Sequence, residues 1–209
     1  ISAGQVNRLL TEGHEAFHQE KDSLLPAARE VSTYLQTDDT SARHRGKGGH
    51  TLHIGNDLFA SFFTTDTKSR VNFLKILLAP YSGYLFNGDA LFYLECFEVP
   101  QKLLTQLQPD TGWIYEDDES WEEQLDAWKI TSADQRRLVT EGALWANLLA
   151  HDLYSDLVLI SDDAGQFKLL AFLHALCWVP MERHVARLIP LTDGQRAAYE
   201  TARRALWSD

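Results

Sequence analysis

The spacing of hydrophobic residues divides the first eighty residues into a helix, three strands and a second helix. Residues 3–29 have hydrophobic side chains at helical spacing, which predicts a helix that ends at Pro26. Six of its positions are expected to form one inward stripe: Val6, Leu9, Leu10, Gly13, Phe17 and Leu24. From Val31 the period changes to two, and consecutive strands are predicted at residues 31–38, 51–54 and 58–65.

Turn and cap residues set the ends of these elements. The first strand is expected to end in two acids, Asp38 and Asp39, before a glycine-rich turn at Gly46, Gly48 and Gly49. Thr67 or Ser69 can cap the second helix, which Pro80 ends. An aromatic run at 81–86 predicts one more short strand.

Residues 89–150 have a different composition, in which helix-forming and acidic residues dominate. Within this stretch, residues 116–128 place seven acidic residues around two tryptophans, which is typical of a solvated helix with an apolar inner face. The residues expected on that inner face are Trp121, Leu125 and Trp128. We therefore interpret residues 89–150 as a helical insertion.

After this insertion the pattern returns to strands. The continuous apolar run at 157–160 predicts a strand covered on both faces. A short helix is expected at 166–174 and a last buried strand at 174–180, and Pro180 suits the first position of a final helix. The fold class is therefore α/β, divided into residues 1–30 (helical lead-in), 31–88 (first part of the core), 89–150 (insertion) and 151–209 (second part of the core).

Composition and charge narrow the classes of function. The net charge of −11 argues against a simple nucleic-acid binder, so any contact with DNA has to use a local basic patch. No apolar run reaches the ~20 residues that a membrane span needs. Only two cysteines are present, Cys96 and Cys177, and no secretory signal is recognisable. These features lead us to expect a cytoplasmic protein without membrane contact.

One short motif suggests zinc chemistry. Residues 14–18 read HEAFH, the H-E-x-x-H pattern in which two histidines one helical turn apart bind zinc and Glu15 acts as the base. The alternative is that His14 and His18 flank the buried stripe and face water. A third ligand is not evident in the sequence.

A second constellation consists of two acidic pairs. Asp38 and Asp39 end one predicted strand, and Asp162 and Asp163 end another. In open α/β sheets, sites lie at the carboxyl ends of strands, and carboxylates that converge there can hold the divalent ions used in phosphoryl chemistry. The alternative is two ordinary acidic turns.

Seven segments together resemble a known family. The chain is similar to bacterial DDE transposases of the insertion sequence sixty-six type, which have a ribonuclease-H-like core, at residues 1–10, 38–47, 53–62, 67–77, 141–149, 161–167 and 174–183. The resemblance implies a ribonuclease-H-like mixed sheet flanked by helices. It further implies DNA nicking and strand transfer of a mobile element, transposon ends and target DNA as partners, a homo-oligomer on DNA, and a place at the bacterial nucleoid.

The same resemblance assigns roles to individual residues. Asp38 corresponds to the first catalytic Asp and Asp162 to the second, and both are expected to bind Mg²⁺ or Mn²⁺. Basic residues close to Asp38 are candidate phosphate contacts, since DNA phosphates are met by Lys and Arg. They are Arg43, Arg45, Lys47, Lys68 and Arg70.

Three positions depart from the family pattern. The catalytic Glu of such enzymes lies on a later helix, so we expect it outside this chain, and Glu182 is the candidate within it. Pro180 stands where a His is expected, and Ser41 where a Gly is expected. The chain is therefore interpreted as a catalytic-core fragment or a decayed copy. The alternatives are an inactive transposase remnant that serves as an interaction module and, third, the zinc metalloprotease.

Overall fold

The computed structural model describes residues 2–44, 46–107, 112–153, 157–168 and 173–205. Two helices, α1 (Ala3–Thr11) and α2 (Glu15–Val31), lead into three strands, β1 (Tyr34–His44), β2 (Lys47–Gly55) and β3 (Ala60–Thr65). The next segment contains α3 (Arg70–Leu78), β4 (Tyr84–Phe86), α4 (Gly88–Cys96), α5 (Gln101–Leu107), β5 (Trp113–Tyr115), α6 (Asp118–Ala127) and α7 (Ala133–Ala150). The chain closes with β6 (Val158–Ser161), η2 (Gly165–Phe167), β7 (Leu173–Leu176), α8 (Trp178–Ala186) and α9 (Asp193–Ala205).

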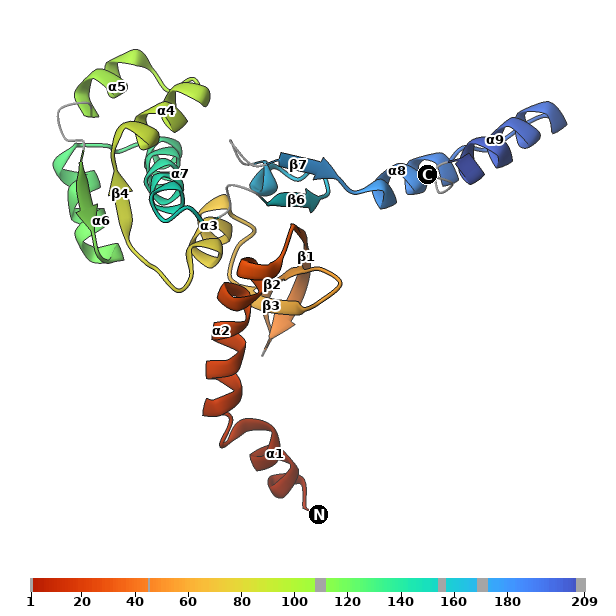
Figure 1. Ribbon diagram of the computed structural model, residues 1–209, viewed down its shortest axis with the longest axis horizontal. Coiled ribbons are helices and arrows are strands. Elements are labelled where there is room, and N and C mark those ends of the chain that lie inside the picture. Colours follow the sequence, from red (N-terminus) through yellow and green to blue (C-terminus); the bar gives the residue numbers. More distant parts are fainter. Residues whose placement is uncertain (1, 45, 108–111, 154–156, 169–172, 206–209) are drawn as a thin grey trace.

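The main sheet is mixed and has five strands in the order β3-β2-β1-β6-β7. β1, β2 and β3 pair antiparallel, whereas β6 runs parallel to β1 and β7 parallel to β6. In Figure 1, α3 and α7 lie to the left of these strands. The predicted α/β class is confirmed, and the mixed sheet flanked by helices is compatible with a ribonuclease-H-like core.

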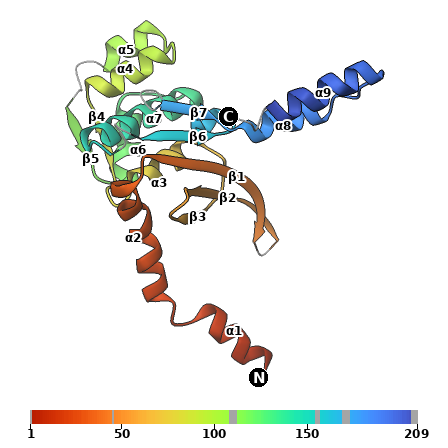
Figure 2. The ribbon, with the colours of Figure 1, turned by 45° about the vertical axis from the view of Figure 1, so that its right-hand side comes forward.

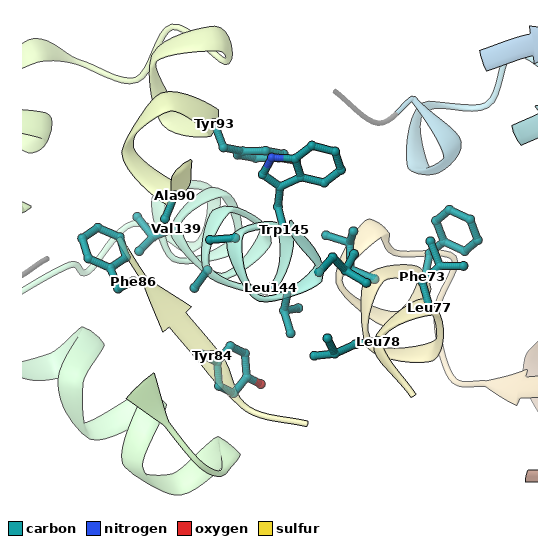
Figure 3. Close-up of a cluster of buried hydrophobic side chains, with 14 of the residues drawn as sticks. Phe73, Leu77, Leu78, Tyr84, Phe86, Ala90, Tyr93, Val139, Leu144 and Trp145 are labelled. Atoms are coloured by element: carbon teal, nitrogen blue, oxygen red, sulfur yellow. The ribbon is translucent and has the colours of Figure 1, made fainter. Parts of the chain in front are cut away.

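The hydrophobic core is centred on α7. Every residue from Val139 to Leu148 is buried, so this helix is surrounded on all sides. Side chains from α3, β4 and α4 converge on it in Figure 3. Gly142 is required at the crossing with α4, because a Cβ there would lie 3.1 Å from the carbonyl oxygen of Ala90.

Several predicted elements are confirmed. Ser69 caps α3 by accepting a hydrogen bond from the Asn72 N–H, and α3 ends before Pro80. In α6 the side chains of Trp121 and Leu125 are buried, and Trp128 is buried directly after it. The stretch from 89 to 150 is mostly helical, but β5 pairs with β4, so the expected boundary at residue 88 falls between two paired strands.

The prediction of one lead-in helix with a buried stripe is wrong. Gly13 has a φ of +75° and separates α1 from α2, and Pro26 lies inside α2 rather than at its end. Both helices point away from the sheet in Figures 1 and 2, so their apolar side chains find no surface to cover them. The exposed side chains are Val6, Leu9, Leu10 and Phe17. Only the end of α2 reaches the core, through Leu25 and Ala28.

The strands also differ from expectation in length and burial. β1 continues to His44 because residues 38–44 pair with β2, so Asp38 and Asp39 lie within the strand and not at its end. Gly48 and Gly49 are part of β2, and Gly46 alone has the left-handed conformation of a turn (φ +79°). β6 is buried on alternate residues only. β7 is an edge strand whose Leu173 and Leu176 are exposed, so it is not the buried strand predicted there.

Candidate functional site

Asp38 and Asp39 lie on opposite faces of the sheet, because side chains alternate along a strand. The carboxylate of Asp39 is 9% exposed and faces α3, where it forms an ion pair with Lys68 and accepts a hydrogen bond of 2.5 Å from Gln166 Nε2. Asp38 is exposed on the other face, where Oδ1 accepts a hydrogen bond of 2.8 Å from the Asp39 N–H. Of the two neighbours, Asp38 is therefore the one available to a ligand.

Asp162 comes level with Asp38 on the neighbouring strand. β1 and β6 pair in parallel, with Gln36 opposite Ile160. Asp38 and Asp162 each follow these paired residues by two positions. Adjacent strands are roughly 5 Å apart. Both residues line one open hollow of about 730 Å³ on the outer face of the sheet. β1 and β6 are neighbours as expected, with Asp38 inside β1 and Asp162 directly after the end of β6, and a metal ion shared by the two acids stays a prediction.

The same hollow contains side chains of other kinds. His53 pairs with Asp38 across the β1–β2 ladder, and its ring packs against Phe62 with centroids 5.1 Å apart. Trp178 and Arg183 of α8 also line the hollow. The hollow thus combines two acids, an imidazole, an exposed aromatic ring and a cation.

The donor set of this hollow fits a single divalent cation. Mg²⁺ is usually bound by one or two carboxylates and completes its coordination with water and substrate phosphates. Asp38 and Asp162 supply those two carboxylates, whereas no group of three or more His, Cys, Asp or Glu side chains among the described residues is placed to hold a metal ion. The fit is therefore to one ion that leaves coordination positions open.

The structure does not bring Glu182 into this group. Glu182 lies on α8, but its carboxylate is directed to α9, 3.7 Å from Arg203, and it does not line the hollow. The neighbouring Arg183 lines it instead. Glu182, the candidate for the third acid, therefore takes part in the contact between α8 and α9.

The five candidate phosphate contacts fall into different environments. Arg43 and Lys47 are exposed near the tip of the β1–β2 hairpin, where they can meet a phosphate. Lys68 neutralises Asp39 on the other face of the sheet. Arg70 is enclosed between α3, α4 and α7 and paired with Glu141, which removes it from the candidates. Arg45 lies outside the described residues.

The zinc pattern lies at the start of α2. His14 is the N-cap residue, its carbonyl oxygen accepts a hydrogen bond of 3.0 Å from the His18 N–H, and its Nε2 lies 3.0 Å from the carbonyl oxygen of Leu9. His18 is one turn later on an exposed surface. No third ligand accompanies them in the part of the chain that the structure describes.

Sequence reasoning missed four residues of interest, namely His53, Trp178, Arg183 and Glu141. For His53 a signal existed, because a hairpin turn centred next to Gly46 places residue 53 opposite residue 38. The others depend on contacts between segments far apart in the sequence. Their positions could not be read from spacing alone.

Comparisons with known proteins identify one similar protein. The chain is 35% identical over 186 residues to the uncharacterized protein y4jO of Sinorhizobium fredii (strain NBRC 101917 / NGR234). The match covers 88% of this chain and 57% of that relative, so the chain spans little more than half of its length. The chain matches no protein-family model and no solved structure. Among the described residues, no helix has the length and apolar character needed to cross a membrane.

Proposed function

We propose that this chain is the catalytic-core region of a DNA transposase that nicks transposon ends and transfers them to target DNA with Mg²⁺ or Mn²⁺. The observation that supports the proposal is that Asp38 and Asp162, each two residues beyond the paired Gln36 and Ile160 of neighbouring parallel strands, line one open hollow. The sequence resemblance supplies the reaction. As its partners we propose transposon ends, target DNA and further copies of the chain, met at the bacterial nucleoid in the cytoplasm.

The residues that line the hollow would have different roles in this reaction. Asp38 and Asp162 would hold the ion, which would act as a Lewis acid on a phosphoryl oxygen. Arg183 is placed to neutralise a phosphate beside the acids, and Trp178 offers a flat surface to a base. Outside the hollow, Arg43 and Lys47 would follow the DNA backbone.

We expect this chain by itself to be a poor nuclease. Two carboxylates hold one ion, whereas in-line attack draws on a preorganised set of charges, and loss of one contributor typically costs ~10²–10³ in rate. The net charge of −11 also weakens the encounter with DNA, because binding draws mainly on neutralised phosphates.

Metal binding is therefore the sharper test. We expect Asp38→Asn and Asp162→Asn each to weaken Mn²⁺ binding at least ~10-fold, measured by electron paramagnetic resonance, because each removes one of two anionic ligands. Asp163→Asn is the matched control, since Asp163 adjoins Asp162 but pairs with Lys168 at 2.8 Å. Equal affinities in all four proteins would refute the proposal.

A second candidate function follows from the position of Glu182. Because its carboxylate pairs with Arg203, an inactive remnant that acts as an interaction module remains a distinct proposal. It predicts no Mn²⁺ binding by the unaltered chain, and association with partner subunits that the Asp38 and Asp162 variants retain.

A further inference from the structure

A buried ion pair connects the helical segment (residues 89–150) with the loop of residues 162–167, which begins with Asp162. Glu141 on α7 is 1% exposed and accepts hydrogen bonds from Arg70 Nη1 at 3.2 Å, Arg137 Nη1 at 2.9 Å and the Tyr93 hydroxyl at 3.0 Å. A carboxylate is buried only at high cost unless it is paired in this way. Burial and the negative charge of Glu141 raise the pKa of Tyr93, so its hydroxyl stays a donor.

Arg70 is the bridge between Glu141 and the loop. Its Nη1 binds Glu141, while its Nη2 donates a short hydrogen bond to the carbonyl oxygen of Gly165. The guanidinium group also lies 4.8 Å from the centre of the Phe97 ring. Because the guanidinium is a planar, rigid fork, the position of Glu141 fixes the position of Gly165.

The loop between Asp162 and Phe167 is attached at two further points. Gln166 donates to Asp39 on β1, and the Phe167 ring packs edge-on against Phe73 of α3, with centroids 5.1 Å apart. Within the loop, the Ala164 N–H donates to Asp162 Oδ1 at 3.1 Å. The direction of the Asp162 carboxylate thus depends on the backbone that Arg70 holds.

We propose that Glu141 is a positioning residue: through Arg70 it fixes the loop of residues 162–167 and so aims the Asp162 carboxylate at the site shared with Asp38. The part of this proposal that concerns metal affinity rests on the proposed function. The link explains why the segments around Arg70, Glu141 and Gly165 belong to one unit although they are far apart in the sequence. It also gives the helical segment an influence on a hollow that none of its described residues lines.

Two substitutions test the link in different ways. Glu141→Gln removes the charge that orients Arg70. Arg70→Lys keeps a positive charge beside Glu141, but a single ammonium group cannot reproduce the fork that joins Glu141 to Gly165. Asp118→Asn is the matched control, because Asp118 also accepts from a tyrosine hydroxyl (Tyr84, 2.6 Å) and pairs with a cation (Lys75, 2.8 Å), and neither contact reaches the loop.

Amide hydrogen exchange of residues 162–167 gives a readout that does not depend on a metal. We expect exchange at least ~10-fold faster in Glu141→Gln and Arg70→Lys than in the unaltered chain and in Asp118→Asn, while amides of β1 keep their protection. If Glu141→Gln does not fold, Arg70→Lys decides the outcome. Unchanged loop exchange in a folded variant would overturn the proposal.

Mn²⁺ binding then separates this proposal from the proposed function. If the unaltered chain binds Mn²⁺, we expect both loop variants to bind it ~5–20-fold more weakly and Asp118→Asn to bind it normally, because a smaller fraction of molecules holds the competent geometry. A loosened loop with unchanged affinity would overturn the positioning role alone. Absence of binding in the unaltered chain would instead sink the proposed function, and the exchange data would still decide whether Glu141 holds the loop.

Discussion

Aromatic side chains are buried around α7 but exposed on the outer face of the sheet, the face on which Asp38 lies. Around α7, Trp121 and Trp145 are each 1% exposed, and Trp121 stacks on Tyr84 with ring centroids 4.9 Å apart. On the outer face, Phe62 and Trp178 are each 59% exposed. The candidate site therefore lies on a surface with exposed aromatic rings, whereas the buried aromatic rings that stabilise the fold lie around α7.

The pairing of acidic side chains also differs between these two regions. In the helical segment, acids are matched by neighbours, as in the pairs of Arg136 with Glu122 and Asp126. On the sheet, the exposed carboxylate of Asp38 accepts a hydrogen bond from the Asp39 N–H and forms no ion pair with the described residues. An acid left exposed on a regular strand contributes little to the fold, which is the behaviour expected of a residue kept for a ligand.

The largest expected effect is on the packed half. Trp145→Ala should lower the free energy of unfolding by about 3–5 kcal/mol, because it removes a fully buried indole and leaves a cavity. Phe62→Ala, on the open face, should change it by about 0.5 kcal/mol or less. Urea denaturation followed by circular dichroism measures both. Similar losses in the two variants would show that the outer face is covered in solution.

A smaller effect is expected for the open half. Trp178→Ala should weaken binding of a single-stranded oligonucleotide by about 1–3 kcal/mol, the value of one base stacked on an aromatic ring. Stability should not change, because Trp178 is exposed. Trp178→Phe keeps an aromatic face and serves as the control. If fluorescence anisotropy gives the same affinity for all three proteins, Trp178 does not contact the nucleic acid.

The smallest effect concerns the pH dependence of stability. Hydrogen bonds from Lys75 and then from Tyr84 lower the pKa of Asp118 from its ordinary value of 3.8. A lowered pKa means that the contribution is present above pH 4 and is lost as the pH falls through the folded-state value. The unaltered chain should therefore lose more stability between pH 5 and pH 3 than Asp118→Asn does. Because Asp118 is largely exposed, the difference should be about 0.5 kcal/mol or less, and equal slopes in thermal unfolding would contradict the prediction.

Features that depend only on residues close together in the sequence were predicted correctly from local sequence patterns. The inward face of α6 and the cap at Ser69 follow from spacing and side-chain chemistry over one or two turns. The exposed stripe of α1 and α2 was mispredicted, because an apolar stripe needs a second surface and spacing does not reveal whether one exists. Pro26 was misjudged in the same way, since contacts of Leu25 and Ala28 hold the helix through it.

The candidate site was predictable only in part. The proximity of the segments that carry Asp38 and Asp162 could be expected from the strand patterns, whereas the metal-binding role that the resemblance implies stays a prediction. Arg70 was misassigned because its buried partner, Glu141, is 71 residues away in the sequence. His53 required knowledge of the hairpin register. Contacts of this kind are set by tertiary packing, on which the spacing of hydrophobic residues gives no information.

Because Asp38 and Asp39 are adjacent in β1 and face opposite sides of the sheet, their positions depend on the number of residues that precede them in the strand. An insertion or deletion of one residue before Asp38 would turn each following side chain to the other face of the sheet. An insertion would carry Asp38 to the position that faces Lys68, whereas a deletion would carry Asp39 to the position that lines the hollow, away from its partners Lys68 and Gln166. Either change leaves one of the two faces without its acid, so among descendants of this sequence this part of β1 should vary by substitution and not in length.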